Sequence, residues 1–179
     1  MHTEPDSAEK WIKALDLKRH PEGGYFAETY RSAARVPGSA LAAPLRGDRS
    51  LTTAIYFLLE SGDVSALHRL RSDEVWHFYA GSSLRLYLID PDGEGREVRL
   101  GRCDDQGEAP QAVVPAGTWF GARVSQPGSY ALCGCTVSPG FEFEDFELGR
   151  REELLRRFPG HREWILSLTA DACPPGTAH

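Results

Sequence analysis

The 179-residue sequence contains little sulfur, no long apolar run and no excess of positive charge. Four cysteines, none of them in a paired CxxC arrangement, exclude a dense disulfide framework and argue against a zinc ribbon. No uninterrupted apolar stretch approaches the ~20 residues needed to span a bilayer. Acidic residues outnumber basic residues by 26 to 20, which argues against a general nucleic-acid binder, because phosphate affinity depends on clustered positive charge. We therefore expect neither a membrane nor a nucleic acid among the partners.

The first ten residues, MHTEPDSAEK, are polar and acidic, unlike a secretory signal. Together with the sparse cysteines, they predict a protein of the reducing cytoplasm. The rest of the composition, 41% hydrophobic and 26% charged, is that of an ordinary globular protein. The length fits one domain with a sizeable core, so we expect a single domain over residues 1–179. Its core is expected at about residues 8–169, with a disordered tail at 170–179.

Short β-prone segments separated by turn signals fill the middle of the chain. These apolar stretches lie at residues 51–59, 84–89, 97–100, 111–114 and 130–137. Clusters of Gly, Pro, Ser and Asp separate them, which is typical of strands joined by tight turns. Many short strands at roughly 10-residue spacing predict a sandwich or barrel.

Helical patterns lie on both sides of this β region. Trp11, Ile12 and Leu15 recur on one face of a predicted N-terminal helix, and REELLRRF with HREWILSLT predicts one or two C-terminal helices. Residues 33–50 are rich in Ala, Pro, Gly and Ser, which predicts a long surface loop or lid. The segment FEFEDFEL alternates Phe with acidic residues and predicts one strand with two faces. The expected fold class is therefore all-β with short terminal helices.

The segment from Gly62 to Gly81 holds the densest set of titratable residues in the predicted β region. Gly62, His68, Glu74 and Gly81 reproduce the spacing of the first motif of cupin barrels, G-x5-H-x-H-x3-E-x6-G, except that Leu70 replaces the second His. The second cupin motif, P-x-G-x2-H-x3-N, lacks both its His and its Asn in this chain.

That second motif aligns with Pro115 and Gly117, and places Phe120 and Val124 where the His and the Asn would stand. Over the whole chain, HPEGGYFAETYRS, SDEVWHFYAG, PQAVVPAGTWFGA and GCTVSPGFEFEDFEL resemble the small bacterial and fungal cupins called Cupin_5. The resemblance covers roughly residues 8–169. It implies a cupin jelly-roll β-barrel and, because similar cupins tend to be dimeric, a homodimer. The family has no settled activity, so the resemblance implies a fold rather than a reaction.

A divalent metal in the barrel would need more ligands than the motif supplies. A metal cupin offers three His and one Glu from facing strands, whereas only His68 and Glu74 stand at matching positions here. Two protein ligands make a weak site. His77 lies three residues after Glu74, and strand alternation points these two side chains to opposite sides. We expect no cofactor, and a bound divalent metal, if there is one, would use His68 and Glu74.

His68 is also a candidate general base. The sequence Leu67-His68-Arg69 resembles the catalytic-His strand of the dTDP-4-keto-sugar 3,5-epimerases, which are metal-free cupin relatives. In those enzymes the His removes a proton next to a ketone, and a carboxylate tunes it. Glu74 would be that carboxylate here, because a neighbouring charge favours the imidazolium and fixes the tautomer. The alternative is that this pair lies in a pocket that only binds.

Further residues are candidates for contacts with a small-molecule ligand. They are Trp76, Gln111, Trp119, Phe120, Tyr30 and Arg31. The first four are expected in the wall of the barrel lumen, although core packing explains its aromatic residues equally well. Tyr30 and Arg31 follow the turn expected at Gly23 and Gly24. Arg31 would either clamp a carboxylate or phosphate group of a ligand or lie solvated on the surface.

Cys133 and Cys135 are two residues apart and therefore share one face of a predicted strand. At ~3.4 Å rise per residue their Cβ atoms lie about 7 Å apart, too far for an unstrained disulfide. We expect both thiols to be reduced and mainly structural.

The sequence thus predicts a cupin-fold protein that binds a small polar organic molecule, sugar-like or a carboxylate, in its lumen. The interpretation we favour adds a metal-independent isomerase or epimerase with His68 as general base. Two alternatives stay open: a metal-dependent cupin enzyme that uses His68 and Glu74, and a small-molecule binding or sensing protein without turnover.

Overall fold

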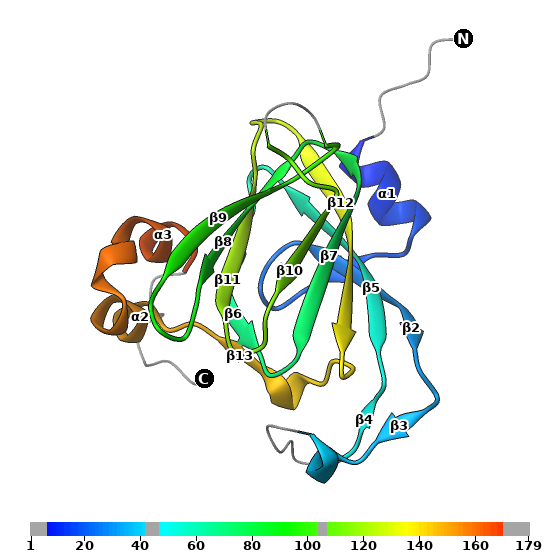
Figure 1. Ribbon diagram of the computed structural model, residues 1–179. Helices are drawn as coiled ribbons and strands as arrows, with labels where there is room; N and C mark the ends of the chain where they lie inside the picture. The colour runs from blue at the N-terminus through cyan, green and yellow to red at the C-terminus, as the bar shows by residue number, and fades with distance from the viewer. Residues whose placement is uncertain (1–6, 42–46, 104–106, 170–179) are drawn as a thin grey trace, which may run out of the picture.

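Two antiparallel sheets form the body of the protein in the computed structural model, which describes residues 7–41, 47–103 and 107–169 (Figure 1). The larger sheet has the order β1 (Lys18–Arg19), β2 (Tyr25–Arg31), β5 (Thr53–Glu60), β12 (Tyr130–Ser138), β7 (Asp73–Gly81) and β10 (Gln111–Val114). The smaller sheet has the order β13 (Phe146–Leu148), β6 (Ser65–Leu70), β11 (Trp119–Val124), β8 (Leu84–Ile89) and β9 (Gly95–Leu100). The predicted all-β jelly roll is confirmed, although the two sheets are not hydrogen-bonded into one closed cylinder within the described residues.

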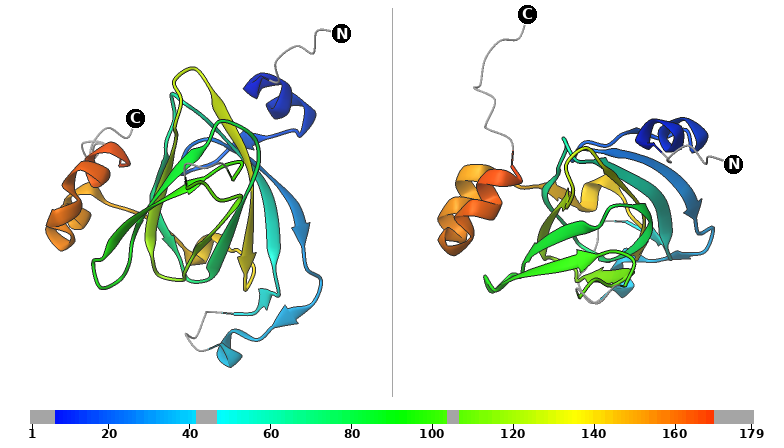
Figure 2. Two further views of the ribbon diagram at one scale, coloured as in Figure 1. Left: turned by 45° about the horizontal axis from the view of Figure 1, so that its top comes forward. Right: turned by 90° about the horizontal axis from the view of Figure 1, so that it is seen from above.

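Three short helices lie on the outside of the sheets. They are α1 (Ala8–Ala14), α2 (Arg151–Arg157) and α3 (Arg162–Ser167). Figure 2 shows α1 on one side of the sheets and the α2–α3 pair on the other. Among the described residues, none of the helices combines the length and apolarity that crossing a membrane requires.

Alternation along the strands divides the apolar side chains between an inner core and two outer clusters. Phe57 and Leu59 of β5 point between the sheets, whereas Leu58 packs outward beneath α1. On β6, Leu67 packs outward against the C-terminal helices, while His68 and Leu70 face inward. Each fully buried side chain of this kind stabilises the fold by roughly 1.5–3 kcal/mol. The pattern also explains how a polar His68 comes to lie inside the jelly roll.

One expected strand is largely wrong. FEFEDFEL contains the 3₁₀ turn η2 (Phe143–Asp145), and only Phe146–Leu148 pairs as β13. A continuous strand would point Phe143 and Phe146 to opposite faces, because they are three residues apart. The 3₁₀ turn brings residues three apart onto one side, and both rings line the same cavity.

The expected loop at 33–50 contains a small hairpin. Its strands are β3 (Arg35–Val36) and β4 (Arg49–Ser50), with a 3₁₀ turn at Gly38–Ala40 between them. Figure 1 shows the hairpin projecting from one end of the jelly roll. Residues 42–46 of the expected loop and the predicted tail at 170–179 lie outside the described residues.

Candidate functional site

A cavity of about 100 Å³ lies between the two sheets. Its inner wall carries imidazole, carboxyl and thiol groups: His20, Glu22, His68, Glu74 and Cys135. Aromatic rings make up much of the remaining surface: Phe26, Phe57, Trp76, Phe141, Phe143 and Phe146. The structure therefore brings the predicted residues His68, Glu74 and Trp76 together in the interior and joins them to residues from the N-terminal hairpin.

His68 is held in one orientation by both ring nitrogens. Its Nδ1 lies 2.7 Å from the carbonyl oxygen of Ala66, and because that oxygen only accepts, Nδ1 carries a proton. Its Nε2 lies 3.2 Å from Oε2 of Glu22. Burial lowers the pKa of His68, and the charge of Glu74 opposes that shift. The face of Phe120 packs behind the ring, with centroids 4.1 Å apart. The ring is thus fixed, with Nε2 aimed at a carboxyl group.

Glu22 is the main site residue that sequence reasoning missed. Gly23 and Gly24 follow it with positive φ, and a Cβ on Gly23 would lie 2.1 Å from the Val64 carbonyl oxygen. The hairpin can therefore press against β6 and turn Glu22 inward. The Ser65 hydroxyl donates to Glu22 Oε1 at 2.8 Å, and burial raises the pKa of Glu22 to about 7. Since the pKa of His68 is lowered, the neutral arrangement has Glu22 donating its proton to His68 Nε2.

Glu74 of β7 is buried with one oxygen unused. Burial raises its pKa to about 7, the charge of His68 lowers it, and Glu22 raises it further. Its Oε2 has no hydrogen-bond partner, and neither does Nε1 of the neighbouring Trp76. The Trp76 indole N–H nevertheless lies close enough to the carboxyl group to favour its ionised form. Buried polar atoms without partners are rare and costly in folded proteins. Trp119 Nε1 is a third such atom, but only the residues Glu74 and Trp76 line the cavity, so these two indicate a place for a ligand.

His20 is a second residue that the sequence analysis missed. The Glu22 backbone N–H donates to its Nδ1 at 3.3 Å, which leaves the proton of the neutral ring on Nε2. Phe26 meets the ring edge-on at 4.7 Å between centroids. Burial lowers the pKa of His20, the charge of Glu22 opposes that shift, and the charge of His68 adds to it. His20 is therefore a neutral side chain at the cavity wall.

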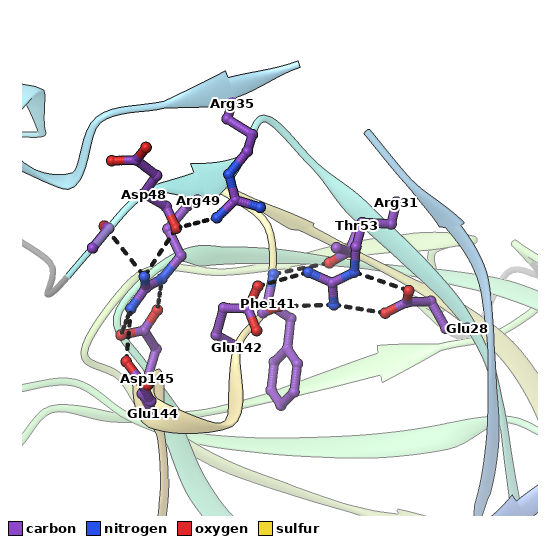
Figure 3. Close-up of polar contacts among 11 residues, drawn as sticks. Glu28, Arg31, Arg35, Asp48, Arg49, Thr53, Phe141, Glu142, Glu144 and Asp145 are labelled. Atoms are coloured by element: carbon purple, nitrogen blue, oxygen red, sulfur yellow. Dashed lines mark hydrogen bonds and ion pairs between the residues drawn. The ribbon is translucent and has the colours of Figure 1, made fainter. Parts of the chain in front are cut away.

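The rim of the cavity is formed by Glu28, Arg31 and Glu142 (Figure 3). Arg31 donates to both Glu28 oxygens at 3.0 and 2.8 Å, to Glu142 at 2.8 Å and to the Phe141 carbonyl at 3.2 Å. These bonds use four of the five guanidinium N–H groups. The predicted ligand clamp is thus placed at the cavity, but two carboxylates of the protein already occupy it.

A bulge in β2 explains why Glu28 and Arg31 share a face although they are three residues apart. Glu28 pairs with Ile55 and Tyr30 with Ala54, so one extra residue, Thr29, is inserted in β2. After the bulge, Tyr30 points away from the cavity and is 54% exposed. Of the two predicted ligand-binding residues, Arg31 therefore lines the cavity and Tyr30 does not.

A buried ion pair anchors the chain segment that carries Glu142. Arg49 donates from Nε to Asp145 at 2.7 Å and from Nη2 at 3.1 Å, and it also donates to the carbonyls of Gly47 and Asp48 (Figure 3). The pair joins β4 to the η2 turn. Phe143 and Glu142 are held at the rim by this contact.

Three expected wall residues do not line the cavity. Trp119 points to the opposite side of β11, where it packs with the C-terminal helices and under the Arg69 guanidinium. Its neighbour Phe120 faces inward but lies behind His68. Gln111 pairs with His77 and donates to its Nδ1 at 3.0 Å on the outer face of the sheet. Adjacent strand residues point to opposite faces, so Trp119 and Phe120 could not both have lined one lumen.

His77 and the two cysteines follow the expected alternation. His77 contacts the Thr136 hydroxyl at 3.1 Å and does not line the cavity. Cys133 and Cys135 both point into the core as free thiols, and Cys135 reaches the cavity wall. Burial raises the pKa of both thiols, which keeps them protonated and unreactive.

The donor set fits a metal poorly. Leu70 lines the cavity where metal cupins have a His, and His68 Nε2 is taken by Glu22. Within the described residues, no three His, Cys, Asp or Glu side chains converge as metal ligands would. A transition metal bound to His68 Nε2 would need to break the Glu22 contact.

Comparison with known proteins places this geometry in a fold class. Oxalate decarboxylase from Bacillus subtilis superposes with a TM-score of 0.52 at 17% identity, over 87% of this chain and 37% of the enzyme. At that identity the likeness supports the cupin fold alone. The protein therefore has the cupin fold, and a family model identifies its family within the cupin superfamily.

Residues 9–149 match the family model described as Cupin_5, Cupin superfamily (DUF985), and the chain belongs to this family. Protein SO0799 from Shewanella oneidensis is 42% identical, with a TM-score of 0.82, over 92% of this chain and 98% of that one. A hypothetical protein from Leishmania major is 38% identical, with a TM-score of 0.85, over 93% and 100%. The uncharacterized yeast protein YML079W of Saccharomyces cerevisiae is 29% identical over 168 residues, 87% of this chain and 82% of its own.

Proposed function

We propose that this cupin binds a small polar organic molecule in its cavity and moves a proton on it without a metal. The observation that carries the proposal is the arrangement of Glu22, His68 and Glu74. Glu22 and His68 hold one proton between Oε2 and Nε2, 3.2 Å apart, while Glu74 keeps an unpartnered oxygen in the same interior. A proton donor and a proton acceptor therefore line one closed site.

The two groups suit a proton shift next to a carbonyl group. Glu74, as carboxylate, takes a proton from the carbon beside the carbonyl, and the C–H electron pair becomes the C=C bond of an enol. The carbonyl oxygen takes its proton from the Glu22–His68 pair. Glu74 then gives its proton to the former carbonyl carbon, while the hydroxyl group on the first carbon returns its proton to the Glu22–His68 pair. A hydroxyketone thereby becomes its isomer, and both groups regain their starting protonation states. A carboxyl group with a pKa near 7 is well matched to this task at neutral pH.

This proposal changes the role first expected for His68. A lone base would use the Nε2 lone pair, but that nitrogen faces Glu22. His68 acts instead as one half of the proton-holding pair, and Glu74 is the group free to accept. Burial shields both carboxyl groups from water and keeps their pKa values in the working range.

Proton exchange into a substrate in D₂O tests the proposal. Wild-type protein incubated with a panel of small hydroxyketones, beginning with dihydroxyacetone, is expected to exchange the C–H protons beside the carbonyl, as followed by NMR. Glu74→Gln keeps the shape of the side chain and should slow exchange by about 100-fold or more. Glu22→Gln should also slow it.

His77→Ala is the matched control, because His77 lies on the outer face of the same strand. Its exchange rate should equal that of the wild type. Equal rates in the wild type and Glu74→Gln would contradict the acid–base role. Binding of a panel member without exchange would show a binding protein without turnover.

A further inference from the structure

The inner end of the cavity contains one unused acceptor and one unused donor. Glu74 Oε2 and Trp76 Nε1 are both buried and unpartnered, and their residues take alternate positions on β7 that face the same side. The other inner polar groups contact one another or the backbone: Ser65 with Glu22, Glu22 with His68, His20 with the backbone and the carboxyl group of Glu22, and Cys135 with the Glu74 carboxyl group. The two free atoms therefore define what a ligand has to supply.

A hydroxyl group supplies both interactions at once. It accepts from the Trp76 indole N–H and donates to the Glu74 carboxyl. A carboxylate or phosphate oxygen has no proton to donate to an ionised Glu74. An ammonium group satisfies Glu74 but has no lone pair for the indole N–H. Among common small groups, the hydroxyl fits the pair of atoms best.

The charges around the cavity disfavour anions in a second, independent way. Four carboxyl groups line it: Glu22 is neutral in the arrangement described above, and Glu28, Glu74 and Glu142 face the single guanidinium of Arg31. That guanidinium is already bonded to Glu28 and Glu142. An incoming anion would have to compete with two carboxylates that the fold holds in place, so the rim offers it no net attraction.

We propose that the ligand is an uncharged, hydroxyl-bearing compound of a few carbons, with one hydroxyl bridging Trp76 Nε1 and Glu74 Oε2, and that carboxylated and phosphorylated analogues are rejected. The inference uses the same cavity as the proposed function and deepens it by stating the substrate class. At ~30 Å³ per water, a volume of about 100 Å³ corresponds to roughly three waters, or to a molecule of about three carbons. The C–H faces of such a molecule pack against Phe57 and Trp76.

Binding is measured by NMR on the indole N–H resonances of the four tryptophans. Trp76→Phe identifies the Trp76 signal by its loss. Three probes of one size carry different charges: dihydroxyacetone is neutral, glycerate is an anion and serinol is a cation. Dihydroxyacetone should shift the Trp76 resonance, and glycerate and serinol should each need at least tenfold higher concentrations. A tenfold change corresponds to about 1.4 kcal/mol of binding free energy.

A rim variant tests the charge argument separately. Glu28→Gln with Glu142→Gln frees Arg31 and should raise the affinity for glycerate about tenfold while leaving that for dihydroxyacetone unchanged. Glu147→Gln is the control, because Glu147 pairs with Arg69 away from the cavity. Tighter binding of glycerate than of dihydroxyacetone by the wild type, or no Trp76 shift with any probe, would overturn the inference.

These outcomes separate the inference from the proposed function. A neutral probe that binds at Trp76 without proton exchange supports the ligand class and contradicts the isomerase chemistry. Proton exchange on an anionic ketone at the same site supports the chemistry and overturns the ligand class.

Discussion

Two groups of charged side chains are buried in this protein to a similar extent, and they differ in how completely their atoms are bonded. In the Arg49–Asp145 pair, the carboxylate receives two short hydrogen bonds, and neighbouring carbonyls bond the same guanidinium. In the cavity, Glu74 leaves one oxygen without any partner. Neither burial nor an unused hydrogen-bonding atom marks a functional group by itself, because the Trp119 indole N–H is also buried and unpartnered but packs in the outer apolar cluster. In Glu74 the unused atom belongs to a side chain that lines the cavity.

The two groups also differ in what they hold. The Arg49–Asp145 pair fixes the η2 turn and with it the rim residue Glu142 (Figure 3). The polar groups of the cavity hold the Glu22 hairpin through Ser65 and His68. Burial raises the pKa of Glu22 and that of Glu74 to about 7. One pair serves architecture, and the proposed function gives the other set a chemical role. Each of the following changes tests one side of this contrast.

The largest expected effect comes from breaking the Arg49–Asp145 pair, whose hydrogen-bonding atoms are all used on the carboxylate side. Asp145→Ala leaves a buried guanidinium without its main partner and should lower the free energy of unfolding by about 3 kcal/mol, as measured by urea denaturation. Glu147→Ala removes half of an exposed pair with Arg69 and should cost less than about 1 kcal/mol. Equal costs for the two variants would show that Asp145 is not a structural anchor.

Removing the Glu74 carboxyl group, which has one unpartnered oxygen, should change how the free energy of unfolding depends on pH. The pKa of Glu74 is raised from 4.5 to about 7, so the folded state binds more protons than the unfolded state between these values. Its contribution to stability is present at low pH and is lost as the pH rises through about 7. Between pH 5 and pH 8, the free energy of unfolding of Glu74→Gln should therefore rise by about 2 kcal/mol relative to that of the wild type.

Urea denaturation at the two pH values checks this prediction. His20 and His68 have lowered pKa values and act in the opposite sense. The contribution of His20 is present in both proteins and largely cancels in the difference, whereas without the charge of Glu74 the pKa of His68 falls further, which adds to the gain in the variant. Glu147→Gln provides the exposed control and should follow the wild-type curve. A pH dependence unchanged by Glu74→Gln would mean that its carboxyl group is not desolvated.

The smallest expected effect is that of added metal. If the free oxygen of Glu74 serves an organic ligand, Mn²⁺, Ni²⁺ or Zn²⁺ should raise Tm by less than about 2 °C, since a ligand stabilises only in proportion to its binding. Protein purified without an affinity tag should contain far less than one transition metal per chain by elemental analysis. Near-stoichiometric metal that survives dialysis would contradict this and favour a metal-dependent cupin.

Strand alternation made much of the site predictable from sequence. The spacing of Gly62, His68, Glu74 and Gly81 identified the motif, and period-2 alternation placed Glu74 and Trp76 inside with His77 outside. The same rule, applied to β11, excludes Trp119 from the wall that Phe120 faces. That error came from assigning neighbouring residues to one face.

Glu22 and His20 were beyond the reach of this reasoning because a hairpin distant in sequence supplies them. Their signal was the pair of glycines after Glu22, which marks a turn but does not say which side chain the turn directs inward. Gly23 is there because the chain passes against the Val64 carbonyl with no room for a Cβ. The local sequence indicates a turn at this point. Which segment the turn packs against depends on how β2 pairs with β5, and a local pattern does not contain that information. The homodimer and the cytoplasmic location stay predictions.

The bulge in β2 makes the rim depend on chain length as well as on residue identity. Thr29 is the extra residue that returns Arg31 to the side of Glu28. A chain shorter by this one residue would keep the positions before it in phase and shift every position after it to the other face. Arg31 would then leave the rim, and Glu28 and Glu142 would lose the cation between them. A relative that differs here by one deletion could thus present a rim of different charge while keeping nearly every side chain the same.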